Sequence, residues 1–230
     1  MVNLVKNFLI LLFFLLLGAL TTIGYRKWGE GKQTREPKVV LKPIQDSKAG
    51  PSDMSGNFSL ENPPSNSLKG KVAAQTGQVF WKSRVATESS SLSPETRIQQ
   101  GEEVETGEGG NLTIEFAGVR SLNILSKSRV NVIQTLPDNL VFQQTDGTVI
   151  YKNTSGLPLA VRSLGLLTQF VSGEVKITIN KSTSIVTLEV TKGSATAAYN
   201  DLKFISHTLT INEGKVLTFN NPKKKASVKG

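Results

Sequence analysis

The feature that most constrains the fold of this chain is a period-two alternation of apolar and polar residues that recurs between Gly70 and Asn221. Val, Ile and Thr dominate the alternating runs. Five runs are clear: Leu112–Phe116, Val130–Val132, Val175–Ile179, Val186–Val190 and Leu209–Ile211. Successive side chains of a strand point to opposite faces, so each run predicts a strand with one face on a core and the other in water.

Turn residues separate these runs at short intervals. The strongest single turn signal is Asp146-Gly147, which predicts a two-residue turn of the primed type. That turn would join Leu140–Gln144 to Thr148–Tyr151 as a hairpin. We expect roughly 12–15 short strands in this segment and no helix. The pattern predicts an all-β domain, built as an antiparallel sandwich or jelly roll or, alternatively, as a short β-solenoid.

The N-terminal segment, residues 1–28, has a different pattern. The 19 residues from Asn7 to Tyr25 carry no charge. A helix of that length spans roughly 28 Å, close to the thickness of a bilayer's hydrocarbon core. Tyr25 and Trp28 lie where interfacial aromatic residues belong. The segment therefore predicts a single transmembrane anchor, and a cleaved signal peptide with Lys6 as its basic region is the alternative.

The charges beside this anchor leave its orientation open. Lys6 precedes the apolar run, whereas five basic residues follow it within residues 26–38. The positive-inside rule by itself would place the C-terminal side in the cytoplasm.

The segments that flank the alternating region are polar or basic. Residues 29–69 hold five of the nine prolines and predict a disordered linker before a domain at residues 70–221. Residues 222–230 follow as a basic tail with Lys223, Lys224, Lys225 and Lys229. We expect this tail to be disordered and solvated or, alternatively, to contact an anionic surface. Residues 70–222 hold 14 Lys and Arg against 13 Asp and Glu, so most of the net charge of +9 lies in the flanks and no nucleic-acid face is predicted.

Composition argues against catalysis. The chain has no Cys and a single His, His207, which we expect at the surface or on a strand edge. No nucleophile-elbow or phosphate-loop motif is present. Four glutamates could offer oxygen ligands to Ca²⁺, but without regular ligand spacing they predict a solvated acidic turn: Glu102, Glu103, Glu105 and Glu108. Trp81 shares its strand parity with Val79 and is expected in the core. We therefore expect no catalytic residues, no metal and no cofactor.

Part of this region resembles a known family. Gly77-Gln-Val79 leads into Phe80-Trp81, and the run Ile98–Phe116 has the order Ile-x-x-Gly, Val-x-Thr-Gly and Leu-x-Ile-x-Phe. Two later segments extend the pattern: Val190–Ala197 and Leu209–Val216. On the basis of all these residues, the region from about residue 70 to residue 219 resembles the FecR-type extracytoplasmic domain, and the two later segments resemble its later strands. The resemblance implies an exported all-β domain that binds a protein or an envelope component.

These observations together predict a non-catalytic binding module in signalling or envelope assembly. We expect a single-pass protein of the inner membrane whose β domain lies in the periplasm, with an unknown envelope protein or polymer as its partner. Only residues 1–7 precede the apolar run, so direct signalling to a sigma factor is not expected. The alternative is a jelly-roll component for lipid or lipopolysaccharide transport. An open apolar groove would favour transport, and a closed, filled core would favour binding through loops. A hydrolase would need two acids at catalytic spacing in a cleft.

Overall fold

The computed structural model describes residues 64–230, which contain sixteen strands and no helix. The all-β class predicted from the alternating residues is confirmed, and each of the five alternating runs lies in a strand. Fifteen of the strands fall between Gly70 and Asn220. The predicted membrane segment, and the linker up to residue 63, lie outside the described residues.

The strands form two sheets, which we call sheet A and sheet B. In order across it, sheet A contains β4 (Arg97–Ile98), β1 (Gly70–Thr76), β6 (Asn111–Phe116), β7 (Arg120–Ile124), the second half of β9 (Asn139–Asn153), β12 (Gly173–Asn180), the first half of β13 (Ile185–Asn200), β15 (Val216–Asn220) and β16 (Lys225–Lys229). Sheet B contains β3 (Ser90–Ser91), β2 (Val79–Lys82), β5 (Glu103–Thr106), β8 (Arg129–Leu136), the first half of β9, β10 (Leu159–Ser163), β11 (Leu166–Phe170), the second half of β13 and β14 (Ser206–Asn212).

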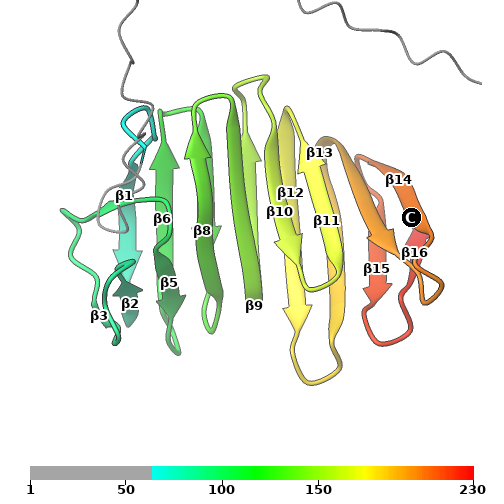
Figure 1. Cartoon of the computed structure of the whole chain (residues 1–230), viewed down its shortest axis with the longest axis horizontal. Helices are drawn as coiled ribbons and strands as arrows, with labels where there is room; N and C mark the ends of the chain where they lie inside the picture. The colour runs from blue at the N-terminus through cyan, green and yellow to red at the C-terminus, as the bar shows by residue number, and fades with distance from the viewer. Residues whose placement is uncertain (1–63) are drawn as a thin grey trace, which may run out of the picture. The chain divides into compact units, whose positions relative to one another are not determined.

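Neighbouring strands follow nearly in chain order from the β1 end of the domain to the β16 end (Figure 1). Every pairing is antiparallel except that of β9 with β10, which is parallel. β9 and β13 are the longest strands, with 15 and 16 residues, and each takes part in both sheets. These two strands therefore link the sheets through continuous backbone.

The two sheets pack face to face over one apolar core. Buried residues alternate with outward-facing ones along the central strands, as in the β6 residues Leu112, Ile114 and Phe116. The ring of Phe116 in sheet A lies 5.6 Å, centroid to centroid, from the ring of Phe142 in sheet B. Phe142 in turn lies 6.1 Å from Tyr151. This contact between the sheets accounts for the strict period-two pattern in the sequence.

The prediction of a hairpin turn at Asp146-Gly147 is wrong. Both residues lie inside β9, where the strand leaves sheet B and enters sheet A. Gly147 has a φ of 75°, and a Cβ there would overlap the Ser128 hydroxyl and the Lys127 carbonyl oxygen. A glycine with positive φ serves a strand corner as well as a hairpin, and only the pairing partners distinguish the two.

A buried polar group supports this corner. The side-chain amide of Gln144 donates to the carbonyl oxygens of Gly147 and Ile177, at 2.9 and 3.1 Å. The hydroxyl of Tyr151 donates to the Gln144 Oε1, 3.2 Å away. Burial raises the pKa of Tyr151 well above its usual value, so the phenol keeps the proton that it donates. The backbone carbonyl groups at the corner thus receive hydrogen bonds from a side chain inside the core.

Among the described residues, both flanks of the predicted domain contain ordered segments that the sequence assigned to a tail or a linker. Lys225–Lys229 pairs with β15 as β16, so the prediction of a disordered tail is wrong: its residues complete the edge of sheet A. At the other end, Leu68 donates its N–H to the Thr135 carbonyl oxygen over 2.7 Å and packs against the core. Residues 64–69 therefore belong with the domain and not with the linker. Backbone pairing supplies an order that polar composition does not reveal.

We predict that Gly147→Ala destabilises the domain by about 2 kcal/mol or more, because the new methyl group meets backbone on a residue with positive φ. Gly118→Ala is the matched control: Gly118 has a φ of 69° but nothing within 4 Å of the added Cβ. Urea unfolding should show a clearly larger loss for Gly147→Ala. Equal losses would mean that the close approach at the β9 corner contributes nothing.

Candidate binding surfaces

The four glutamates predicted to form an acidic turn do not converge on one site in the structure. Glu103 and Glu105 lie on the outward face of β5 and share the guanidinium of Arg129, which is 2.6 Å from Glu105 and 4.0 Å from Glu103. Glu108 pairs with Lys127 at 3.1 Å. Within residues 64–230 no group of three or more His, Asp and Glu side chains could hold a metal ion. These carboxylates instead make cross-strand and turn ion pairs.

Glu102, the fourth glutamate, is buried with only 5% of its surface exposed. Its Oε2 accepts hydrogen bonds from the Trp81 indole at 2.9 Å and from the Gln99 N–H at 2.8 Å. Desolvation raises the pKa of Glu102, although these hydrogen bonds and the charge of Arg84 act in the opposite direction. Trp81, expected in the core, is half-buried and packs against its edge. The Glu102 carboxyl group therefore ties the turn between β4 and β5 to Trp81 of β2. It is enclosed by these contacts and is not exposed to a ligand.

An aromatic stack closes the C-terminal end between the sheets. Tyr199 of β13 stacks on His207 of β14, with the ring centroids 5.1 Å apart, and contacts Phe219 of β15 at the same distance. The His207 Nε2 lies 3.1 Å from Asp201 Oδ2. His207 is half-exposed on β14, an edge strand of sheet B, as expected for a surface or edge residue.

The turn between β13 and β14 carries a group of exposed apolar side chains that we call the apolar tip, residues 202–205. Leu202, Phe204 and Ile205 are 70%, 86% and 54% exposed. Phe204 has a φ of 60°, a conformation that bulky residues rarely adopt. Isolated exposed apolar residues are ordinary, but three in four consecutive positions form a patch.

Asp201 holds the apolar tip in this conformation. Its Oδ1 accepts hydrogen bonds from the N–H groups of Lys203 and Ile205, at 2.8 and 2.9 Å, while its Oδ2 faces His207. The hydrogen bond with His207, followed by that from Ile205, lowers the pKa of Asp201. The apolar tip is therefore presented by a defined hydrogen-bonded turn.

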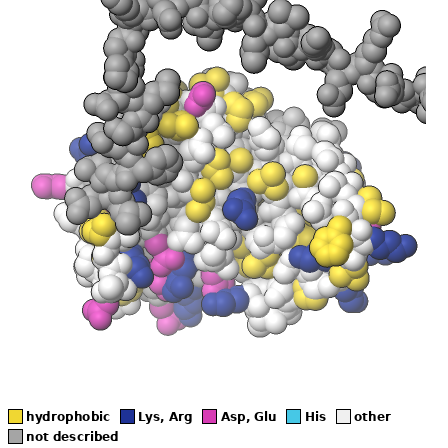
Figure 2. Space-filling model, in the orientation of Figure 1, with side chains coloured by type: hydrophobic (Ala, Val, Ile, Leu, Met, Phe, Trp, Pro, Cys, Tyr) yellow, Lys and Arg dark blue, Asp and Glu magenta, His cyan; other side chains and the backbone are white. Residues whose placement is uncertain are grey.

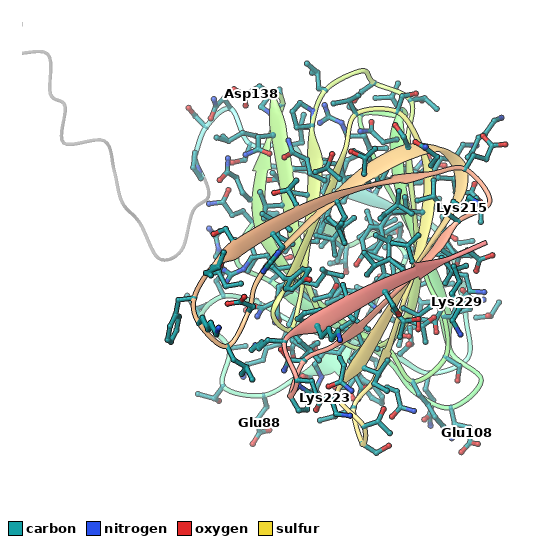
Figure 3. All side chains as sticks on the ribbon, turned by 90° about the vertical axis from the view of Figure 1, so that its right-hand side faces the viewer. Glu88, Glu108, Asp138, Lys215, Lys223 and Lys229 are labelled. Atoms are coloured by element: carbon teal, nitrogen blue, oxygen red, sulfur yellow. The ribbon has the colours of Figure 1, made fainter. Side chains whose placement is uncertain are left out.

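Two other turns adjoin the apolar tip. Gly165 of the β10–β11 turn lies against Asn221 and Lys224 of the β15–β16 turn, and Leu164 beside it is 42% exposed. The turn that carries Lys223 lies next to the β13–β14 turn, on the opposite side of the domain from Asp138 (Figures 1 and 3). We call this group of three turns the C-terminal corner.

Sequence reasoning did not find the apolar tip. The segment 201–205 follows a strand and contains two alternating apolar positions, so it resembles ordinary strand residues. The signal that could have identified it is Asp201, a residue type whose side chain caps turns. Its hydrogen bonds to two following N–H groups mark a turn and leave the apolar side chains in water.

No helix among residues 64–230 is long and apolar enough to cross a membrane.

Comparisons with known proteins give distant similarities only. No protein-family model matches the chain, and no curated protein matches it. Two crystal structures of a "putative anti-sigma factor" from Parabacteroides distasonis, at 2.50 and 1.65 Å resolution, have TM-scores of 0.48 and 0.49 and identities of 11% and 10%. Each similarity covers 56% of this chain and 59% of the other.

We predict that Glu102→Gln stabilises the domain at neutral pH. The raised pKa means that folding favours the protonated carboxyl group, so its stability contribution is present at acid pH and is lost as pH rises through the folded pKa. Glutamine keeps an oxygen acceptor for Trp81 and Gln99 without the buried charge. Urea unfolding at pH 4 and pH 7, with Glu115→Gln on an exposed face as control, should show the gain mainly at pH 7. An equal gain in the free energy of unfolding at pH 4 and pH 7 would show that the buried charge of Glu102 is not the cause of the stabilisation.

We predict that Asp201→Ala loosens the apolar tip without unfolding the domain. Hydrogen exchange should accelerate at the N–H groups of Lys203 and Ile205, because both lose their acceptor. Asp201→Asn keeps that oxygen and should preserve most of the protection. Since the pKa of Asp201 is lowered, the protection should be complete near neutral pH and fade as pH falls through that pKa. Unchanged exchange in Asp201→Ala would show that the turn does not need this side chain.

Proposed function

We propose that the chain is a membrane-anchored, extracytoplasmic binding module that engages a protein partner or an envelope polymer and performs no catalysis. Its place would be in signalling or envelope assembly. The apolar segment of residues 1–28 supports the anchor, and the resemblance of residues 70–219 to the FecR-type domain supports export. That resemblance is also the reason to prefer an extracytoplasmic domain over the orientation that the charge count alone indicates.

The observation that carries the proposal is the filled core. The core side chains of both sheets are between 0% and 7% exposed, and rings from the two sheets are in contact between them. A carrier of lipid or lipopolysaccharide needs an open apolar groove for acyl chains. A core that is filled by its own side chains supports contact through surface turns and strands, and favours binding over transport.

The polar groups near the single histidine also support a non-catalytic role. Asp201 and His207 form a pair of the kind that orients a catalytic base. The adjacent hydroxyl, Ser206, is directed to the Asn200 side chain at 2.8 Å, and neighbouring residues of a strand point to opposite faces. The carboxylate of Asp201 is engaged by the backbone of the apolar tip. Asp201 and His207 therefore support the turn between β13 and β14.

Topology is the first test. Alkaline phosphatase fused to the C-terminus should be active in intact cells, because the enzyme matures only outside the cytoplasm, where its disulfides form. N-terminal sequencing of the fusion should return the uncleaved sequence that begins at Met1. A fusion to residues 1–28 alone is the control, since it reports the orientation of the anchor without the domain.

The outcomes separate the parts of the proposal. Activity with an intact N-terminus supports the anchored module, and activity with a cleaved N-terminus replaces the anchor by a signal peptide. An inactive full-length fusion would mean that the domain is cytoplasmic, and the proposal would then fail together with the function that the family resemblance implies.

A further inference from the structure

The charge of the domain is unevenly distributed along its length. Residues 64–153 hold nine Lys and Arg and nine Asp and Glu, whereas residues 154–230 hold ten basic residues against four acidic ones. In Figure 2, the acidic side chains of the visible face lie mostly on its left, mixed with Lys and Arg, whereas hydrophobic side chains beside Lys and Arg occupy its right-hand side. Chain order follows position across the sheets, so this difference in sequence becomes a basic end of the domain.

The apolar tip lies within that basic end. Lys203 is exposed between the apolar residues of the tip, Lys223 is exposed on the adjoining β15–β16 turn, and Lys225 is exposed at the start of β16. Lys181 is exposed on the β12–β13 turn, where the Ser184 carbonyl oxygen accepts the Asn221 N–H at 3.1 Å. Asp201 is the one acid in these turns, and it is held by His207 and by the backbone of the tip.

We infer that the C-terminal corner docks on the surface of an anionic phospholipid bilayer. Leu202, Phe204 and Ile205 would enter the boundary between head groups and acyl chains, while the surrounding lysines contact lipid phosphates. An apolar group with Phe and Leu inside a ring of Lys is the composition of interfacial membrane contacts, whose strength combines apolar burial with attraction to anionic lipid. The inference goes beyond the proposed function and does not depend on which side of the membrane the domain occupies.

The same residues fit a protein partner less well. Protein interfaces are depleted in Lys and enriched in Arg and in the aromatic residues Tyr, Trp and Phe at their centre, and of these the corner offers only Phe204. Among residues 164–165, 201–205 and 221–225 there are four Lys, no Arg and no Trp. Flexible lysine side chains suit mobile, dispersed phosphates, which need no fixed bidentate geometry. The occupant that matches both the charge and the apolar groups is therefore a lipid surface.

The absence of cysteine from the chain allows a local readout. Leu202→Cys, labelled with an environment-sensitive fluorophore, reports on the apolar tip in the full-length protein reconstituted into vesicles. Asp138→Cys reports on the opposite side of the domain (Figure 3) and controls for simple proximity to the bilayer. Vesicles of phosphatidylcholine alone are compared with vesicles that also contain phosphatidylglycerol.

The expected result is a blue shift at position 202, with quenching by spin-labelled lipid, that depends on phosphatidylglycerol and weakens with added salt. Position 138 should not respond. In the labelled background, Phe204→Ser with Ile205→Ser should weaken the response about tenfold or more, as expected when large apolar side chains no longer enter the membrane. Lys223→Glu with Lys225→Glu should reduce it as well, whereas Val85→Ser, at an exposed apolar residue elsewhere, should leave it unchanged.

Circular dichroism and thermal unfolding verify that each variant remains folded, which is expected because the substituted side chains are exposed. Equal responses at positions 202 and 138, an equal response without phosphatidylglycerol, or no effect of the lysine substitutions would each overturn the inference. A photo-crosslinker at position 202 that captures a specific protein in cells, and no lipid, would also overturn it in favour of a protein partner. None of these outcomes depends on the alkaline phosphatase result, so the two proposals fail separately.

Discussion

The passage of β9 from one sheet to the other is the constraint on which the rest of the domain depends. The strand pairs with β8 and β10 before the corner and with β7 and β12 after it, so a single backbone sets the register of both sheets. Gly147 permits the bend, and Gln144 satisfies backbone acceptors inside it. β13 repeats the arrangement nearer the C-terminus. With two strands shared, the sheets cannot separate without breaking pairing in both.

A core closed in this way leaves the surface as the place for function. Buried rings and aliphatic side chains fill the space between the sheets, and the buried carboxyl group of Glu102 is enclosed by its own hydrogen bonds. The turns are freer, because most of their side chains lie outside the core, and they tolerate unusual side chains. The apolar tip uses that freedom. Its exposed Phe204 and positive φ work against stability, and the hydrogen bonds to Asp201 offset part of that cost.

The basic C-terminal residues have a second effect at the sheet edge. Lys225 and Lys229 lie on β16, the last strand of sheet A, where charged side chains discourage pairing with another chain. Lys225, beside the turn that carries Lys223, extends the positive end of the domain next to the apolar tip, whereas Lys229 lies at the opposite end of β16. One short segment thus both completes a sheet and contributes to a charged surface. Composition alone assigned this segment to a disordered tail because its lysines are compatible with either state.

The sequence by itself determined the all-β class, the alternating faces and most strand positions, because the side-chain period of a strand is a local property. It also indicated that His207 lies at the surface or on a strand edge, and it excluded chemistry with thiols. Tertiary structure decided what local patterns leave open. Asp146-Gly147 suits a hairpin or a strand corner equally, and only the partners of β9 chose the corner. The segment 201–205 reads as strand or turn, and only the hydrogen bonds of Asp201 made it an exposed tip. Such choices depend on contacts distant in sequence, which short patterns do not encode.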